Sequence, residues 1–199
     1  ITLNRGLFPT NGSSIDLMLH TTLPGSDINY YKINVRNKIY RPLGVADLVF
    51  GFVGELGYID AFSDTKVTPF FENFYSGGPR SLRGFESNTL GPRVTPAPCY
   101  EYDPVNDICP DIIDTDGDGI PDAPAQNPYA FSQYDDPIGG NLLIEGSLQL
   151  IFKLPIVDDT RSMRSAFFLD FGNVFSTDCQ DYQLNCSDPS IDELRYSIG

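Results

Sequence analysis

The sequence predicts an all-β fold, a fragment of an antiparallel transmembrane β-barrel with about six strands. Apolar and polar residues alternate with a period of two along several segments of about ten residues, as in transmembrane strands. The connections are short on one side and long and acidic on the other. A soluble β-sandwich also alternates, but its strands are usually shorter and its loops more even. The barrel is therefore the favoured architecture.

The alternation defines each strand in turn. The predicted strands cover residues 15–23, 31–39, 48–58, 142–152 and 167–175, and residues 194–198 begin another. In the second strand Lys32, Arg36 and Lys38 share one face, opposite Ile33 and Val35. A basic stripe of this kind does not suit the core of a soluble protein. The sequence thus predicts an apolar outer face and a polar inner face.

Several features at the ends of strands add expectations. Tyr30, Tyr40 and Tyr58 stand at strand ends and are candidates for the aromatic belt of a membrane interface. The first residues, 1–4, resemble the end of a strand, so the chain is expected to begin within a fold. Because about six strands cannot close a transmembrane barrel, which needs about eight, residues 1–199 are expected to form part of a larger barrel.

The composition excludes some function classes. A formal charge of −14 and a pI near 4.2 argue against nucleic acid as a partner, because phosphates require a basic surface. No apolar run is long enough for a transmembrane helix, and the sequence begins with no signal-peptide pattern. The single histidine and the lack of GxSxG, HExxH and phosphate-loop motifs argue against an enzyme.

A glycine-rich stretch, residues 74–92, contains four glycines and the run Leu82-Arg83-Gly84-Phe85. Such a composition suits neither a helix nor a central strand and predicts a shaped loop. Together with residues 72–78 and 87–92, this run closely resembles the sixth extracellular loop of the BamA family (bacterial surface antigen family). Members of that family insert β-barrel proteins into bacterial outer membranes through a roughly sixteen-stranded barrel. The resemblance covers nearly the whole chain.

The resemblance implies a position and a role for this loop. It makes residues 62–137 the sixth extracellular loop and implies that the loop folds back into the barrel interior. Arg83 is then expected to pair with Asp170 on the inner wall, with Phe168 packed nearby. On the neighbouring strand Gln149 stands where several relatives have an acid, and Glu145 is a candidate for a second charge.

Four cysteines predict disulfide bonds of an oxidising compartment. Neither local pair has the spacing or the histidines of a zinc site. Three pairings are open, and proximity in the sequence favours Cys99 with Cys109 and Cys179 with Cys186. The family resemblance agrees, since it implies a cystine of similar span in the sixth loop.

The acidic insert 99–125 contains a candidate calcium loop. Its acids fall at relative positions 1, 3, 5 and 9, with a backbone carbonyl ligand at position 7, as in the first nine positions of a calcium-binding loop. The ligand candidates are Asp114, Asp116, Asp118, Ile120 and Asp122. Position 12 is Ala125, so the bidentate glutamate of an EF-hand is missing. A solvated acidic turn is the alternative, and no cofactor is expected to be required.

The resemblance implies a non-enzymatic barrel insertase of the outer membrane. Its expected partners are unfolded outer-membrane protein clients, outer-membrane lipid, and the assembly-machinery lipoproteins, which would bind periplasmic domains outside this chain. The alternatives are a TamA-like or two-partner-secretion translocation barrel and, in a different class, a passive porin.

Overall fold

The computed structural model describes most of the chain, and every structural statement below concerns these residues. They are residues 2–6, 8–23, 25–45, 47–65, 67–94, 136–153, 165–179 and 186–199.

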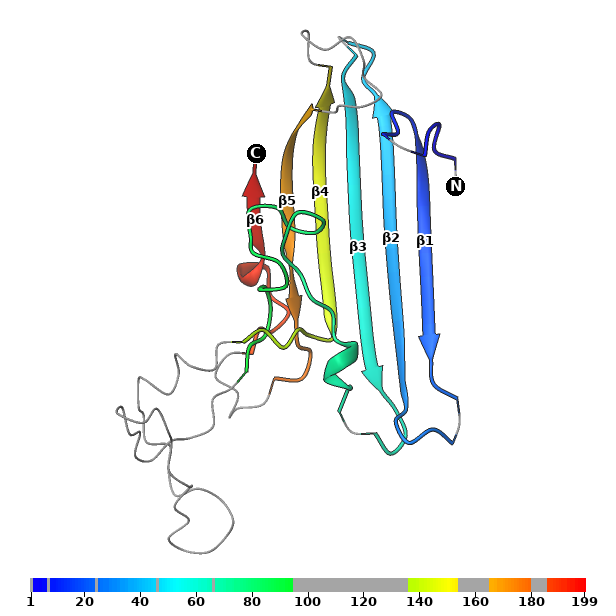
Figure 1. Ribbon diagram of the computed structural model, residues 1–199, viewed down its shortest axis with the longest axis vertical. Coiled ribbons are helices and arrows are strands. Elements are labelled where there is room, and N and C mark those ends of the chain that lie inside the picture. The colour runs from blue at the N-terminus through cyan, green and yellow to red at the C-terminus, as the bar shows by residue number, and fades with distance from the viewer. Residues whose placement is uncertain are drawn as a thin grey trace, which may run out of the picture.

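Six strands form one antiparallel sheet in chain order (Figure 1). They are β1 (Gly12–Thr21), β2 (Tyr30–Pro42), β3 (Val49–Ala61), β4 (Leu142–Phe152), β5 (Ser165–Phe175) and β6 (Arg195–Ile198). Two short 3-10 helices, η1 (Phe70–Glu72) and η2 (Ile191–Glu193), lie in connections. None of the described helices is long and apolar enough to span a membrane. The all-β antiparallel prediction is confirmed.

The alternation of residues gives the sheet two different faces. The outer face carries apolar side chains in cross-strand register, for example Leu17 opposite Val35 and Val35 opposite Leu56. Leu17 is 70% exposed and Leu56 is 56% exposed. A continuous apolar face of this size needs an apolar environment, which a lipid bilayer supplies.

The inner face is polar along its centre. Arg36 stands opposite Glu55, and Glu55 stands opposite Glu145. The Nε of Arg36 lies 3.3 Å from Oε2 of Glu55, and Asn34 donates to Oε1 of the same carboxylate at 2.9 Å. Charges on this face are therefore partly paired across neighbouring strands.

The prediction of an aromatic belt is wrong for two of its three tyrosines. Tyr30 and Tyr40 are each 7% exposed and belong to apolar clusters on the inner face. Tyr30 and Tyr40 have even numbers, as Lys32 and Arg36 on β2 do, so all four side chains point to the inner face and away from the lipid. Tyr58 lies on the outer face and donates to Asp60 at 3.1 Å.

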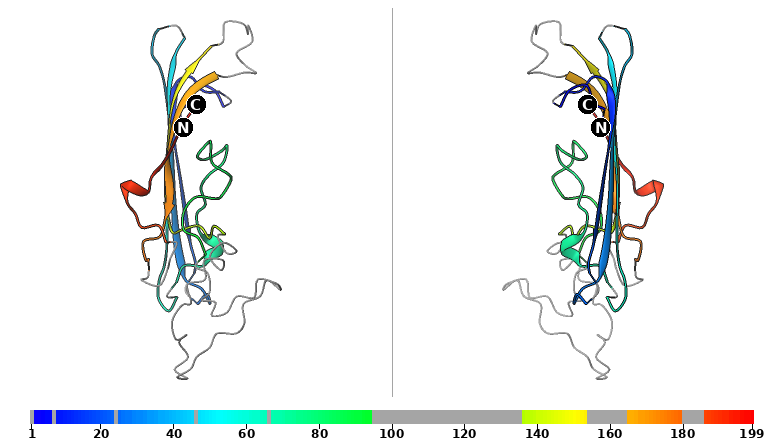
Figure 2. Two further views of the ribbon diagram at one scale, coloured as in Figure 1. Left: turned by 90° about the vertical axis from the view of Figure 1, so that its left-hand side faces the viewer. Right: turned by 90° about the vertical axis from the view of Figure 1, so that its right-hand side faces the viewer.

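The connections cover both faces of the sheet at one end. Figure 2 shows residues 74–92 on one side of the sheet and η2 on the other. Alternation places Asn173 of β5 on the outer face, yet Asn173 is only 2% exposed. Its Nδ2 donates to the carbonyl of Glu193 in η2 at 2.7 Å. The segment that contains η2 therefore shields a polar side chain that would otherwise face lipid.

Candidate functional site

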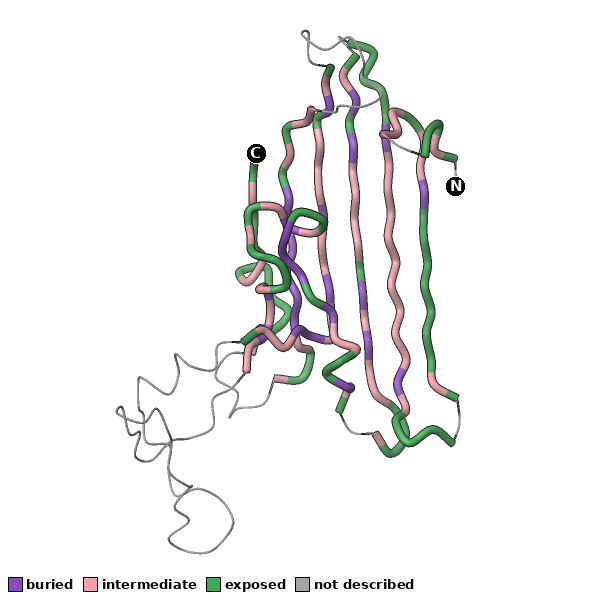
Figure 3. The backbone as a smooth tube through the Cα atoms, viewed as in Figure 1, coloured by how far each residue is buried: buried purple, intermediate pink, exposed green. Residues whose placement is uncertain are grey.

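The glycine-rich stretch, residues 74–92, forms a compact loop against the inner face of β4 and β5, and we call it the anchored loop. Its two arms meet in a backbone bridge between Ser76 and Leu90. Leu82 near its tip is 1% exposed, and its Cδ1 would lie 3.1 Å from a Cβ placed on Gly172 of β5. Figure 3 shows the buried positions concentrated where this loop crosses the sheet. The loop thus packs on the wall rather than extending into solvent.

Arg83 fastens the anchored loop to two strands. Its Nε donates to Oδ2 of Asp170 at 2.7 Å, and its Nη2 donates to Oδ1 at 2.6 Å. The same Nη2 donates to Oγ of Ser147 on β4 at 2.9 Å. The backbone N–H of Arg83 donates to Asp170 as well, at 3.2 Å. The guanidinium therefore makes a bidentate pair, which is the strongest class of charge-assisted hydrogen bond.

The surroundings exclude water from the carboxylate of this pair and leave part of the guanidinium exposed. The side chain of Asp170 is 1% exposed and that of Arg83 is 29% exposed. The guanidinium carbon of Arg83 lies 3.5 Å from the centroid of the Phe168 ring. Cation–π stacking and the bidentate pair fix the guanidinium plane from two directions. The arrangement can hold a loop in one position, because a buried pair is costly to separate.

The other expected partners of Arg83 contact different groups. Glu145 accepts a hydrogen bond from Oγ of Ser81, and Gln149 donates to Oγ of Ser147 at 3.1 Å. Within the described residues neither side chain forms an ion pair or hydrogen bond with Arg83. Arg83 therefore reaches β4 through Ser147, and Glu145 binds the loop separately through Ser81.

Sequence reasoning missed Ser147 and Ser81. The signal for Ser147 is its register, because it stands directly opposite Asp170. Ser81 also accepts from the backbone N–H of Gly77 at 3.1 Å, so it braces the loop internally.

The remaining motif residues lie at the edge of the site. A Cβ on Gly84 would lie 3.4 Å from Cβ of Ser197 on β6, so the loop approaches the sixth strand here. Phe85 is partly buried.

The cysteine prediction is confirmed for one pair. Cys179 and Cys186 form a disulfide with a Cα–Cα distance of 5.8 Å. Cys99, Cys109 and the candidate calcium loop 114–122 lie outside the described residues, as does the whole of the insert 99–125. In the described part of the chain no group of three or more histidine, cysteine or acidic side chains could hold a metal ion.

Comparison with known proteins identifies the family. The Omp85 superfamily domain matches residues 2–199. The chain belongs to the Omp85 superfamily. It is accordingly part of an outer-membrane β-barrel of a Gram-negative bacterium.

Individual Omp85 relatives resemble the chain over different lengths. Outer membrane protein assembly factor BamA of Neisseria meningitidis serogroup B is 30% identical over 217 residues, which cover 98% of this chain and 22% of that protein. The crystal structure of BamA from Haemophilus ducreyi lacking POTRA domains 1–3 is 31% identical, with a TM-score of 0.72, over 100% of this chain and 33% of that one. A SAM50-like protein of Drosophila melanogaster is 30% identical over 92 residues, 46% of this chain and 20% of that protein. The chain thus spans a fifth to a third of these relatives.

Proposed function

We propose that the full-length Omp85 protein containing this chain is the central component of an outer-membrane assembly machinery that folds and inserts β-barrel proteins. Similarity to an assembly factor over 98% of the chain supports this proposal. The observation that carries it is the anchored loop, which is fastened by Arg83 to a buried carboxylate on the inner wall. The role is mechanical rather than enzymatic.

The geometry suggests how such a loop acts. Arg83 joins the loop to β5 through Asp170 and to β4 through Ser147. A strut of this kind keeps neighbouring strands in register while strands elsewhere in the barrel separate to admit a client. The pair suits this role because its separation would leave the buried carboxylate of Asp170 without its counter-charge.

Depletion of the full-length protein tests the proposal. Many outer-membrane β-barrel proteins are expected to lose folding and to accumulate in the periplasm, which quantitative proteomics of outer membranes measures. Loss of a single secreted protein would instead indicate a translocation barrel, and loss of solute uptake alone would indicate a porin. Either of these two results would overturn the proposal.

The proposed partners follow from the proposed function. They are unfolded outer-membrane proteins as clients, outer-membrane lipid around the apolar face, and lipoproteins of the assembly machinery bound by periplasmic domains outside this chain. Affinity purification of the full-length protein, with cross-linking before detergent is added, is the direct assay for the lipoproteins.

We also propose that the acidic segment 114–122 binds one calcium ion. Oxygen ligands spaced at alternate residues support this proposal, since Ca²⁺ takes carboxylate and carbonyl oxygens. Calorimetric titration of the full-length protein is expected to show one site that disappears when Asp114 and Asp116 are both changed to Asn. Absence of heat and of a thermal shift at calcium concentrations of about 1 mM, the range of extracellular calcium modules, would contradict it.

A further inference from the structure

The first residue of the anchored loop, Phe74, and Glu72 just before it make a second attachment to the inner face, which reaches β2 and β3. Lys32 on the inner face of β2 donates from Nζ to the carbonyl of Glu72 at 2.6 Å. The same Nζ lies 3.3 Å from Oε2 of Glu72. It also lies 4.7 Å from the centroid of the Phe74 ring. One ammonium group is thus bound by a carbonyl, a carboxylate and an aromatic face.

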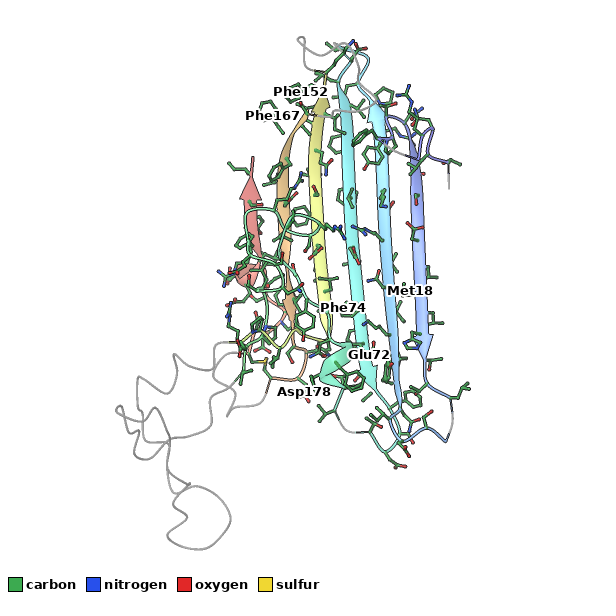
Figure 4. The ribbon with its side chains drawn as sticks, viewed as in Figure 1. Met18, Glu72, Phe74, Phe152, Phe167 and Asp178 are labelled. Carbon is green, nitrogen blue, oxygen red and sulfur yellow. A yellow bond between two sulfur atoms is a disulfide. The ribbon has the colours of Figure 1, made fainter. Side chains whose placement is uncertain are left out.

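The position of Phe74 is fixed from both its ring and its backbone. A Cβ on Gly57 of β3 would lie 2.6 Å from two atoms of the Phe74 ring, so the ring occupies the space that this glycine leaves. The backbone of Phe74 exchanges two hydrogen bonds with Gly140, at 2.9 and 3.0 Å. Phe74 is 7% exposed. Figure 4 shows Glu72 and Phe74 close together beside the lower part of β3.

The surrounding apolar cluster joins four strands. Phe74 packs in one buried cluster with residues from β2, β3, β4 and β5, which are Tyr30, Ile59, Leu143 and Val174. The cluster lies under the Lys32 contact and leaves the side chain of Lys32 21% exposed. A cation that is partly desolvated binds an aromatic ring and a carboxylate more strongly than one in water.

We propose that Lys32, Glu72 and Phe74 form a second clamp, which positions the root of the anchored loop on β2 and β3. Among the residues that the structure describes, the Arg83 side chain contacts β4 and β5, so the Arg83 pair by itself does not fix the loop relative to β2. With both attachments the loop spans four strands. Lys32 is a positioning residue in this account. The effect of the clamp on client insertion rests on the proposed function, whereas its effect on the loop does not.

The test changes Lys32 to Met in the full-length protein, which keeps the aliphatic stem and removes the charge. Hydrogen exchange of the Asn73 and Phe74 amides in the purified protein is expected to become about tenfold faster. The reason is that the neighbouring residue Glu72 loses its hydrogen bonds with the ammonium group of Lys32. Exchange at the Gly78 amide, which donates to the Leu82 carbonyl near the Arg83 end, is expected to stay unchanged. Lys32→Arg is expected to restore slow exchange.

Lys38→Met is the matched control. Lys38 lies on the same face of β2, and its side chain has no hydrogen-bond or ion-pair partner among the described residues. Unchanged exchange in Lys32→Met, or equal acceleration in Lys38→Met, would overturn the clamp. Accelerated exchange with normal assembly of outer-membrane proteins in cells would overturn its role in insertion. Normal assembly on depletion of the whole protein would instead overturn the proposed function.

Discussion

Replacing Arg83 with Ala in the full-length protein is expected to cost the folded barrel about 3–5 kcal/mol, the range for breaking a buried ion pair. The reason is the partner that stays behind. Asp170 is 1% exposed and accepts three hydrogen bonds from Arg83. Two of the three come from the side chain, so the substitution leaves a buried carboxylate without its counter-charge. The measurement is the urea midpoint of the purified barrel in detergent.

A double-mutant cycle decides whether the pair itself is responsible. Asp170→Ala is expected to be similarly destabilising alone, and the double variant is expected to lose much less than the sum. Arg83→Lys keeps the charge but cannot make the bidentate pair or the flat stack on Phe168. It is therefore expected to retain only part of the stability. Additive losses in the cycle would mean that the two side chains act separately.

The strands were predictable because their pattern is local. A period of two places each side chain on a face without knowledge of the rest of the chain. The turn after β2 shows the limit of that method. The alternation predicts the second strand over residues 31–39, yet β2 continues through Pro42, and the turn is closed by the bond from the Leu43 N–H to the Leu48 carbonyl. Strand ends depend on pairing with the neighbour, which a local pattern does not contain.

The same alternation rule, applied to Tyr30 and Tyr40, predicts the inner face for both tyrosines. The aromatic type of Tyr30 and Tyr40 and their place at strand ends make them candidates for a lipid interface. Their even numbering with Lys32 and Arg36 places them on the inner face, where both are buried. For a strand of a membrane barrel, parity is therefore a better guide than residue type.

The anchored site was predictable only in part because most of its contacts are long-range. The resemblance of the loop motif supplied Arg83 and Asp170, which are 87 positions apart. Ser147 depends on the register between β4 and β5, and Lys32 meets Glu72 across 40 positions. No local pattern in the sequence encodes these distances. The contacts that lie outside the motif, those of Ser147 and Lys32, are thus the part of the site that the sequence does not indicate.

Gly91→Ala is the second substitution for which we expect a large effect, about 2–4 kcal/mol of lost stability from backbone strain and overpacking together. Gly91 has φ +102°, in the region that favours glycine. A Cβ there would lie 2.8 Å from Cβ of Val174 and 3.1 Å from its carbonyl oxygen. Val174 is fully buried in β5, so it has little room to move away. The measurement is the temperature at which the barrel unfolds. Samples are heated to increasing temperatures, and the band of the folded barrel is compared on gels with that of an unheated sample.

Gly25→Ala is the matched control, because it separates backbone strain from the close approach. Gly25 has a similar positive φ, +95°, but a Cβ there would meet nothing within 4 Å. Gly25→Ala is therefore expected to cost about 1–3 kcal/mol, the strain of the backbone alone. The additional loss in Gly91→Ala then measures how tightly the returning arm of the anchored loop presses on β5. Equal losses in the two variants would show that this arm is not packed against Val174.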